Sequence, residues 1–349
     1  MDKDMRDKPL RWAWLLIMTI ATIGLEAQDY KNWVKQAPRL DNAYFNTEKA
    51  RVVAENVLSF QISTGAWPKN INFFHERCTR QLDVNEGTID NDATITEVRF
   101  LMRLYNATHD ERYRTAAQRG IEYMITMQYA NGGWPQYWPR NDHYHAYITY
   151  NDNAMVNVMN LLRHVAEAKE PFYDSTLPDS IRHKAQAAFD RGVECILRTQ
   201  VVKDGRPTVW CQQYYPATLQ PAPARAFELV GLCSSESVNI VLLLNSLPNP
   251  SDRVKTAIQG AMEWYEASKI EHLGRQDFID SLGRADYRMV PDTTATPQWA
   301  RFYTLDGNRP FFVGRDGVMR FRVEEIEHER RNGYAWYGRQ PEKLFHTAR

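Results

Sequence analysis

One short pattern occurs three times along this chain, and it constrains the fold more than any other feature. In each copy a glutamine is followed by a glycine and then by a proline, with a tryptophan beside or shortly after that proline. The copies run from Gln61 to Pro68, from Gln128 to Pro135 and, more loosely, from Gln200 to Pro207, with Trp210 after it. They lie about 70 residues apart, and such self-similarity indicates a fold built from one repeated supersecondary unit.

Between the copies, apolar residues recur every three or four positions. This is the spacing of one helix face rather than the alternation of a strand. Ile95, Val98, Met102 and Tyr105 keep this spacing, for example. We therefore predict one helix followed by three helical hairpins. The predicted ranges are 46–60 for the single helix and roughly 91–128, 152–200 and 236–268 for the hairpins.

Polar residues precede each predicted hairpin, at Asp90–Asp92, Asn151–Asn153 and Ser234–Ser237. Asp, Asn and Ser are preferred N-caps, so we predict that they begin the first helix of each hairpin. Residues 275–349 lack the helical period, and we expect short strands and irregular structure there. The predicted fold class is mainly α. It is an (α/α)3 toroid-like helical barrel with irregular loops and a few short strands, whose inner helices start on one common face.

The N-terminal segment does not belong to that fold. Met1 to Arg11 is rich in charge, and Trp12 to Leu25 is an uncharged apolar run. With a rise of 1.5 Å per residue, this run of about 14 residues is too short to cross a hydrocarbon core ~30 Å thick. We predict a secretory signal peptide over residues 1–27, one mature domain over residues 28–349, and a secreted or periplasmic location. An uncleaved anchor is the alternative.

The composition is that of a globular chain without net charge. Lys+Arg and Asp+Glu both number 43, which argues against a dedicated nucleic-acid binder. Aromatic residues make up 12%, which is typical either of sugar-binding proteins or of a helical core filled with rings. The four cysteines match no metal-ligand spacing, and a disulfide among Cys78, Cys211 and Cys233 stays open. We expect a monomer with no nucleic-acid partner and, after signal cleavage, no membrane partner.

Two of the polar segments offer ligands for a metal ion. Asp90-Asn91-Asp92 and Asn151-Asp152-Asn153 combine carboxylate and amide oxygens, which suit a hard cation such as Ca²⁺. Neither segment has the spacing of an EF-hand loop. Because the same residue types are also preferred helix caps, the metal-binding and the structural interpretations both stay open.

Arginines at three places suit the binding of acidic groups. Arg225 lies in a long, proline-rich loop, and loops of this length in compact domains are often functional. Arg301 and Arg315 lie among aromatic residues and glycine turns, where a planar guanidinium can bind a carboxylate through two parallel hydrogen bonds. Structural ion pairs, such as one between Arg225 and Glu228, are the alternative interpretation.

Six motifs occur in order along the chain. They are Trp67-Pro68-Lys69-Asn70, Thr88 to Thr94, Gly132 to Tyr137, Tyr150 to Met155, Ala224 to Glu228 and Arg309 to Phe312. Together they resemble the motifs of the pectate lyases of polysaccharide lyase family 10, and the resemblance covers almost all of the chain after the predicted signal. Any one motif alone would be weak, whereas six in order make the resemblance specific.

This resemblance implies a helical (α/α)3 toroid-like module that cleaves polygalacturonate by Ca²⁺-assisted β-elimination and leaves a 4,5-unsaturated sugar end. The implied site residues are, for the metal, Asp90, Asn91 and Asp152; for the catalytic base, Arg225; and for the substrate carboxylates, Arg301, Arg315 and Lys69. The chain departs from the family pattern at Tyr214-Tyr215 and at Pro223. These departures concern loop contacts and substrate preference more than the reaction.

An arginine base is chemically demanding, because the guanidinium pKa exceeds about 12. Nearby Ca²⁺ and other cations would disfavour its charged form, and the neutral fraction falls as pH drops, so we predict an alkaline optimum. Two other functions stay open. One is a secreted glycoside hydrolase of helical toroid fold, with Asp90 and Asp152 as acid and base. The other is a non-catalytic protein that binds acidic glycans in a Ca²⁺ groove.

Overall fold

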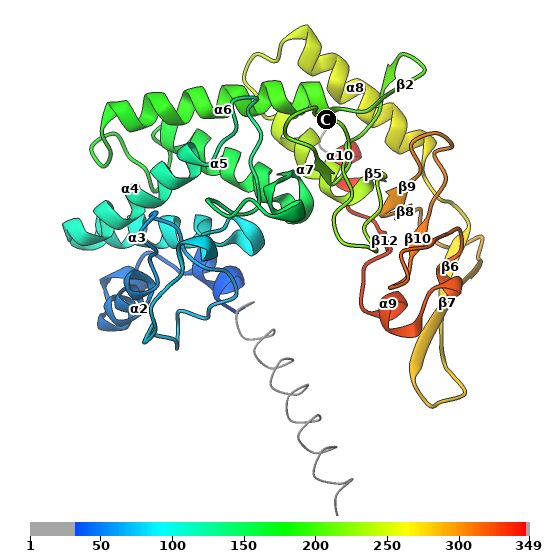
Figure 1. Cartoon of the computed structure of the whole chain (residues 1–349), viewed down its shortest axis with the longest axis horizontal. Coiled ribbons are helices and arrows are strands. Elements are labelled where there is room, and N and C mark those ends of the chain that lie inside the picture. The colour runs from blue at the N-terminus through cyan, green and yellow to red at the C-terminus, as the bar shows by residue number, and fades with distance from the viewer. Residues whose placement is uncertain (1–31, 347–349) are drawn as a thin grey trace, which may run out of the picture. The chain divides into compact units, whose positions relative to one another are not determined.

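The computed structural model describes residues 32–346, which form two compact units (Figure 1). The first unit comprises the described residues up to Tyr123 together with Ala168–Pro178. The second comprises Met124–Glu167 and the residues from Asp179 onward. The predicted signal peptide over residues 1–27 lies outside the described residues and stays a prediction, as does the domain boundary after it. None of the described helices is both long and apolar enough to cross a membrane.

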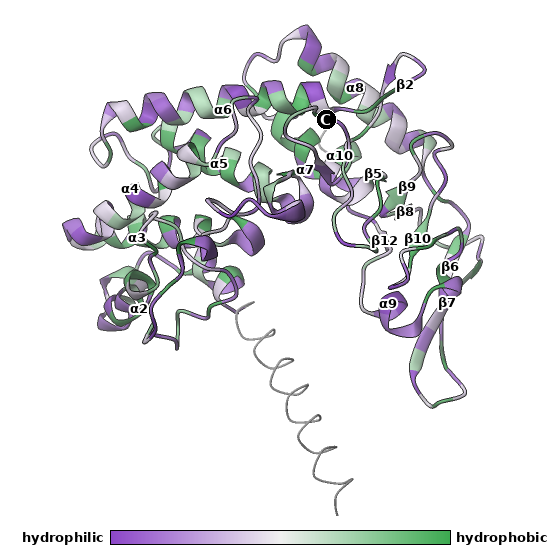
Figure 2. Ribbon diagram, viewed as in Figure 1, coloured by the Kyte–Doolittle hydropathy of each residue, from purple (hydrophilic) through white to green (hydrophobic). Residues whose placement is uncertain are grey.

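The helices lie where the apolar spacing predicts them. A single helix is followed by three helical hairpins, and Figure 2 shows apolar and polar residues interspersed along them. Met155, Val158, Met159 and Leu162 are all fully buried, as the one-face spacing requires. The helices are α2 (Glu48–Ser59), α3 (Ile95–Thr108), α4 (Glu111–Thr126), α5 (Ala154–Ala166), α6 (Asp179–Thr199), α7 (Ser234–Asn245) and α8 (Asp252–Ala267).

The prediction that polar side chains cap the first helix of each hairpin is wrong. α3, α5 and α7 all start without a hydrogen bond from a capping side chain. Asp90–Asp92 and Asn151–Asn153 instead form short 3-10 turns, η4 and η6, ahead of α3 and α5. The middle residues of these turns, Asn91 and Asp152, have positive φ angles of 53° and 50°. Asn and Asp favour both N-caps and this left-handed conformation, so residue type alone could not distinguish the two.

The glutamine of each repeat joins the end of one helix to the middle of the second helix in the next hairpin. Its side-chain Nε2 donates to a carbonyl in its own loop and to an alanine carbonyl in that helix, at 2.7 to 2.9 Å. The sets are Gln61 with Gly65 and Ala116, Gln128 with Gly132 and Ala188, and Gln200 with Thr208 and Ala257. We call these contacts the glutamine clamp. They explain why the same residue recurs at this position.

The tryptophan of each repeat fixes the loop on both sides. Trp67, Trp134 and Trp210 are fully buried, and each indole N–H donates to a carbonyl of the preceding helix. The backbone carbonyl of each tryptophan accepts from an N–H just ahead of the next hairpin. Those N–H groups belong to Thr88, Thr149 and Cys233. These bonds determine where the polar turns η4 and η6 begin.

Beyond α8 the chain has strands and short helices, as the missing helical period predicts. β6 (Leu273–Ile279) and β7 (Ala285–Pro291) form an antiparallel hairpin (Figure 1). Phe302, Phe312 and Trp336 belong to a buried aromatic cluster in this region. The two-residue strand pairs are β1 (Ile148–Thr149) with β4 (Gln213–Tyr214), β2 (Val202–Lys203) with β3 (Arg206–Pro207), β5 (Leu232–Cys233) with β9 (Phe302–Tyr303), β8 (Trp299–Ala300) with β12 (Tyr337–Gly338), and β10 (Phe312–Val313) with β11 (Met319–Arg320). The helices beyond α8 are α9 (His328–Asn332) and α10 (Glu342–His346).

The cysteines contribute to packing rather than to cross-links. All four are free thiols, and Cys195, Cys211 and Cys233 are buried. Burial raises the pKa of Cys195 and of Cys211 to about 12, which keeps both as unreactive thiols. The disulfide that the sequence left open among Cys78, Cys211 and Cys233 is therefore not formed in this structure.

Candidate active site

The first polar turn, η4, is held by the loop that carries Lys69. Lys69 Nζ lies 2.5 Å from Asp90 Oδ2, and only 6% of Asp90 is exposed. Next to this pair, the side-chain amide of Asn91 donates to Asn70 Oδ1 at 2.9 Å. Within the first unit the structure thus brings together a predicted substrate-binding residue, Lys69, and two predicted metal ligands. In this arrangement Lys69 supplies the positive charge that balances the Asp90 carboxylate.

The backbone around this turn is unusual for the residues that form it. Thr94, just ahead of α3, has a φ of 66°, which a β-branched residue rarely adopts. Its hydroxyl donates to Thr88 O at 2.8 Å and accepts from Trp67 N at 3.1 Å. Such conformations persist only where the surroundings over-determine them, and they cluster at functional sites. The tryptophan of the repeat therefore also helps to shape the polar turn.

The second polar turn, η6, opens into a small pocket of the second unit. Asp152 lines this pocket, which has a volume of about 180 Å³, together with Glu236 and Arg301. The side-chain amide of Asn151 donates to Asp152 Oδ2 at 2.9 Å. The structure thus places a predicted metal ligand and a predicted substrate-binding arginine in one pocket.

The donor chemistry of each turn, taken by itself, suits a calcium ion. Asp90, Asn91 and Asp152 offer carboxylate and amide oxygens, the hard ligands that Ca²⁺ prefers. None of the three side chains caps a helix, so the helix-cap interpretation that the sequence left open does not apply to them. Fit by donor chemistry supports the assignment of these three residues as metal ligands, and the assignment itself stays a prediction.

Glu236, at the start of α7, binds Arg301 inside the pocket. Its buried carboxylate accepts from Arg301, Ser235, Cys233 and Gln212. Burial alone would raise the pKa of Glu236, but the Arg301 guanidinium and the other donors outweigh it, so this pKa lies below its ordinary value. Arg301 is therefore a cation held in place by a buried anion.

Sequence reasoning missed Glu236, although a signal for it existed. Glu236 is the one ionisable residue in the third predicted helix start, Ser234–Ser237. The residue types at the other two helix starts predict both a metal site and a cap, whereas those at this start predict only a cap. A repeat that places polar side chains at one structural position twice should be examined for the same chemistry at the third.

Arg225 lies in the proline-rich loop between β4 and β5 and is paired with Glu228. Its Nε donates to Glu228 Oε2 at 2.9 Å, and its Nη2 donates to the other carboxylate oxygen. These hydrogen bonds raise the pKa of Arg225, although its partial burial acts in the opposite direction. The ion pair that the sequence left open is therefore present. It favours the charged form of the residue that the family resemblance assigns as base.

Four guanidinium groups gather around two aromatic rings of the second unit. They belong to Arg225, Arg301, Arg315 and Arg330, and we call them the arginine cluster. The Cζ atoms of Arg225, Arg315 and Arg330 lie 4.9, 4.7 and 4.4 Å from the centroid of the Phe227 ring. Those of Arg301 and Arg330 lie 4.6 and 3.9 Å from the centroid of Tyr334. The structure thus connects the three predicted arginines and adds Arg330. Sequence reasoning missed Arg330 because it lies outside every motif and periodic pattern.

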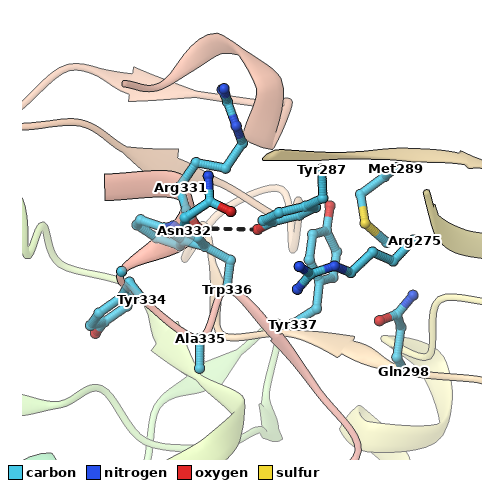
Figure 3. A pocket seen from close by; sticks show the side chains of 11 residues that line it. Arg275, Tyr287, Met289, Gln298, Arg331, Asn332, Tyr334, Ala335, Trp336 and Tyr337 are labelled. Atoms are coloured by element: carbon cyan, nitrogen blue, oxygen red, sulfur yellow. Dashed lines mark hydrogen bonds between the residues drawn. The ribbon is translucent and has the colours of Figure 1, made fainter. Parts of the chain in front are cut away.

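A larger pocket, of about 460 Å³, lies between the β6–β7 hairpin and the segment that follows α9. Figure 3 shows Arg275, Tyr287 and Tyr337 among the side chains that line it. Tyr334 points away from these three (Figure 3), and its ring instead contacts Arg301 and Arg330. Tyr334 therefore both lines this pocket and contacts the arginine cluster through its ring.

Within residues 32–346, one group of Asp and His side chains has metal-ligand spacing. Ligand atoms of Asp280, Asp286 and His328 lie within 4.8 Å of one another. Asp286 is bonded to Arg331 at 2.5 Å, Asp280 is bonded to Arg284 at 2.7 Å, and His328 Nε2 lies 2.8 Å from a backbone oxygen. Internal partners thus already occupy these groups, and they do not coincide with the predicted ligands.

Comparisons with known proteins give one family. A family model described as pectic acid lyase matches residues 61–345. The solved structure of a family 10 polysaccharide lyase from Cellvibrio cellulosa is 31% identical, covers 93% of this chain and 96% of its own, and has a TM-score of 0.79. A mutant of a family 10 polysaccharide lyase from the same organism, in complex with trigalacturonic acid, is 30% identical, covers 93% of this chain and 97% of its own, and has a TM-score of 0.78. No curated protein sequence matches significantly. These structural matches confirm the predicted fold class, a mainly helical, toroid-like fold with a few short strands.

Proposed function

The chain belongs to the pectate lyases of polysaccharide lyase family 10, and from this premise we propose that it cleaves α-1,4-polygalacturonate by Ca²⁺-assisted β-elimination. The products are 4,5-unsaturated oligogalacturonides. The observation that carries this proposal is the arginine cluster, which gathers four guanidinium groups around Phe227 and Tyr334. A polyuronate presents one carboxylate on every ring, and guanidinium groups bind carboxylates in a bidentate geometry.

Asp90, Asn91 and Asp152 would hold the calcium ion through their side-chain oxygens. When bound, Ca²⁺ draws charge from the C6 carboxylate of the substrate and thereby makes the neighbouring C5 proton more acidic. The same three residues carry the negative charge and oxygen dipoles that such an ion requires. This need for acidic ligands also explains how a protein of zero net charge can act on a polyanion.

The cationic side chains bind the substrate carboxylates. Arg301 is held by Glu236 and lines the small pocket together with Asp152, so it offers a guanidinium in a fixed place. Arg315 and Lys69 are more exposed and are paired with carboxylates of the protein. They bind substrate by exchanging those partners for a carboxylate of the polyuronate.

Arg225, in its neutral form, removes the proton from C5. The electron pair of the C5–H bond forms the C4=C5 double bond. The C4–O bond breaks, and the glycosidic oxygen leaves with its electron pair and takes up a proton from water. Because Glu228 favours the charged form of Arg225, the neutral fraction is small at neutral pH. The rate therefore rises with pH as that fraction grows.

One assay tests the proposal: polygalacturonate is incubated with the protein, with and without EDTA, and ultraviolet absorbance of the conjugated double bond is followed. The wild type should generate the absorbance in Ca²⁺ and lose it in EDTA. Arg225→Ala should lose at least about a thousandfold in turnover, because it removes the proton acceptor.

A matched control for that variant is Arg339→Ala. Arg339 is also exposed and is also paired with a glutamate three residues later, but it lies outside the arginine cluster. It should keep the activity of the wild type. Release of reducing ends without ultraviolet absorbance would identify a hydrolase. Binding without turnover, unchanged in Arg225→Ala, would identify a glycan-binding protein. Either result rejects the lyase mechanism.

We further propose that residues 1–27 are removed on export and that the mature protein acts as a monomer, secreted or in the periplasm. Its support is the short apolar run behind a charged start. N-terminal sequencing of the protein isolated from its native cells should find Gln28 as the first residue. An intact N-terminus in the membrane fraction would instead identify an uncleaved anchor.

A further inference from the structure

Arg330 is the most deeply buried member of the arginine cluster. Only 5% of it is exposed, and its Nε and Nη2 are buried without a hydrogen-bond partner among the described residues. Its Cζ lies 4.4 Å from the ring centroid of Phe227, 3.9 Å from that of Tyr334 and 5.1 Å from that of Trp336. Aromatic faces therefore take the place of the polar partners that a buried guanidinium usually has.

Stability does not account for an arginine at this position. A buried charge with two donor nitrogens left unpaired is costly, and cation–π contacts return only part of that cost. Burial accordingly lowers the pKa of Arg330, more than Tyr334 and Glu228 raise it. A methionine of similar length would fill the same space among the rings without the cost of burying a charge.

The position of Arg330 relates it directly to Arg225. The two guanidinium groups share the Phe227 ring, and each Cζ lies within 4.9 Å of the ring centroid. The two carbons are therefore no farther apart than twice that distance. Like charges at that separation, in partly buried surroundings, disfavour the charged form of each other by about tenfold in the protonation equilibrium.

The other charged groups around Arg225 act in both directions. Those that favour its charged form are Glu228, Tyr144 and Tyr334. Arg315 and Arg330 share the Phe227 ring with Arg225, and as like charges they disfavour its charged form. Arg315 is exposed and paired with Glu329 at 2.8 Å, so solvent and this glutamate weaken its effect. Arg330 is buried, and its charge is less screened.

We propose that Arg330 is a positioning residue of the lyase site, whose buried charge opposes Glu228 at Arg225 and so sets the alkaline range in which Arg225 acts as the base. This inference rests on the proposed function. It assigns to Arg330 no contact with substrate. It explains why a costly charge is retained in an aromatic environment, next to an arginine that must lose its own proton.

The test is the pH profile of kcat/KM on polygalacturonate for the wild type and Arg330→Met. Without the opposing charge, Arg225 holds its proton more tightly, so the rising limb should move to higher pH. On that limb kcat/KM should be about tenfold lower than in the wild type, and the two profiles should converge at high pH. The thermal unfolding midpoint of Arg330→Met should equal or exceed that of the wild type, because the variant no longer buries a charge.

Two further variants make the test decisive. Arg330→Lys keeps the charge and should stay within about threefold of the wild type on the same limb. Arg322→Gln removes a charge from an exposed side chain in the same region and should leave the profile unchanged. The inference is overturned if Arg330→Met lowers the rate equally at every pH, if it changes KM alone, or if it unfolds at a lower temperature. Absence of ultraviolet product from the wild type would reject the proposed function itself, which is a separate result.

Discussion

Two buried glutamates, one in each unit, show how differently the same side chain can be ionised. Glu97 in α3 accepts a hydrogen bond from Trp33 Nε1 at 2.7 Å, and its Oε2 has no partner among the described residues. Burial raises the pKa of Glu97 to about 7. Glu236 in α7 is equally buried, but Arg301 and three other donors keep its pKa below the ordinary value. Burial alone leaves a carboxyl group close to neutral, and a guanidinium is needed to keep it charged.

This difference in ionisation corresponds to a difference in role between Glu97 and Glu236. Glu97 serves the core of the first unit and need not be ionised there. Glu236 must be an anion, because Arg301 would otherwise lose the partner that holds it beside Asp152. Three kinds of variant test this comparison, in order of decreasing expected effect. The first breaks the Arg301 contact, and the second removes the charge of Glu97. The third removes a weaker cationic partner from another carboxylate.

The largest effect is expected for Arg301→Met, which would make Glu236 resemble Glu97. The variant leaves a buried carboxylate unpaired, and we expect a loss of about 3–5 kcal/mol in the free energy of unfolding at neutral pH, together with loss of pectate cleavage. Denaturant unfolding measures the first effect. The double variant Arg301→Met/Glu236→Gln should recover most of the stability and none of the activity. Equal stability of the single and double variants would show that Glu236 does not depend on Arg301.

The pH dependence of this effect has a definite sign. The pKa of Glu236 is lowered from 4.5 in the folded protein, so its stabilising contribution is present above 4.5 and is lost as the pH falls through the folded value. In Arg301→Met the charged carboxylate of Glu236 is buried without its guanidinium partner, so it destabilises the folded state. This variant should therefore become relatively more stable as the pH falls toward the ordinary range of a carboxyl group, where Glu236 takes up a proton.

A smaller effect of opposite sign is expected for Glu97→Gln. The pKa of Glu97 is raised from 4.5 to about 7, so its favourable contribution is fully present below 4.5 and is lost as the pH rises through 7. At pH above 8 the wild type should therefore be less stable than Glu97→Gln by up to about 3 kcal/mol. Thermal unfolding at pH 5 and pH 9 measures this, and a variant with the same pH dependence as the wild type would contradict it.

The smallest effect is expected for Lys69→Met, which removes the cation from Asp90. Lys69 Nζ competes with a metal ion for this carboxylate, so its removal should lower the Ca²⁺ dissociation constant about fivefold, or ~1 kcal/mol, as for a partly exposed pair. Isothermal titration calorimetry without substrate measures this. Lys255→Met, which disrupts an exposed pair with Asp252, is the control. Weaker Ca²⁺ binding in Lys69→Met would show that Lys69 supports the metal site rather than competing with it.

The helical framework could be predicted from the sequence because its signals are local. Apolar spacing predicts the helices α2 to α8, and the recurring glutamine and tryptophan indicate the repeat from the sequence alone. The ionisation of Arg225 and the roles of Glu236 and Arg330 could not be predicted in this way. Glu236 meets Arg301, and Arg330 meets Phe227, only through folding of distant segments. No local pattern encodes those pairs, because their energy depends on burial and on partners far along the chain.

The glutamine clamp has a consequence for how this fold can evolve. The amide Nε2 of each clamp binds only main-chain oxygens, and the helix that it reaches supplies the alanine carbonyl of Ala116, Ala188 or Ala257. In two of the three clamps the same helix also supplies an arginine that donates to the glutamine Oε1, Arg119 to Gln61 at 3.4 Å and Arg191 to Gln128 at 2.6 Å. Replacement of that alanine by a bulky residue would crowd the approach of the amide. A glycine of each helix also lies against the repeat, because a Cβ on Gly120, Gly192 or Gly260 would meet Trp67, Trp134 or Pro207. Exposed positions elsewhere on these helices make none of these contacts, so we expect them to vary more freely than the amide, arginine and glycine positions that join one hairpin to the next.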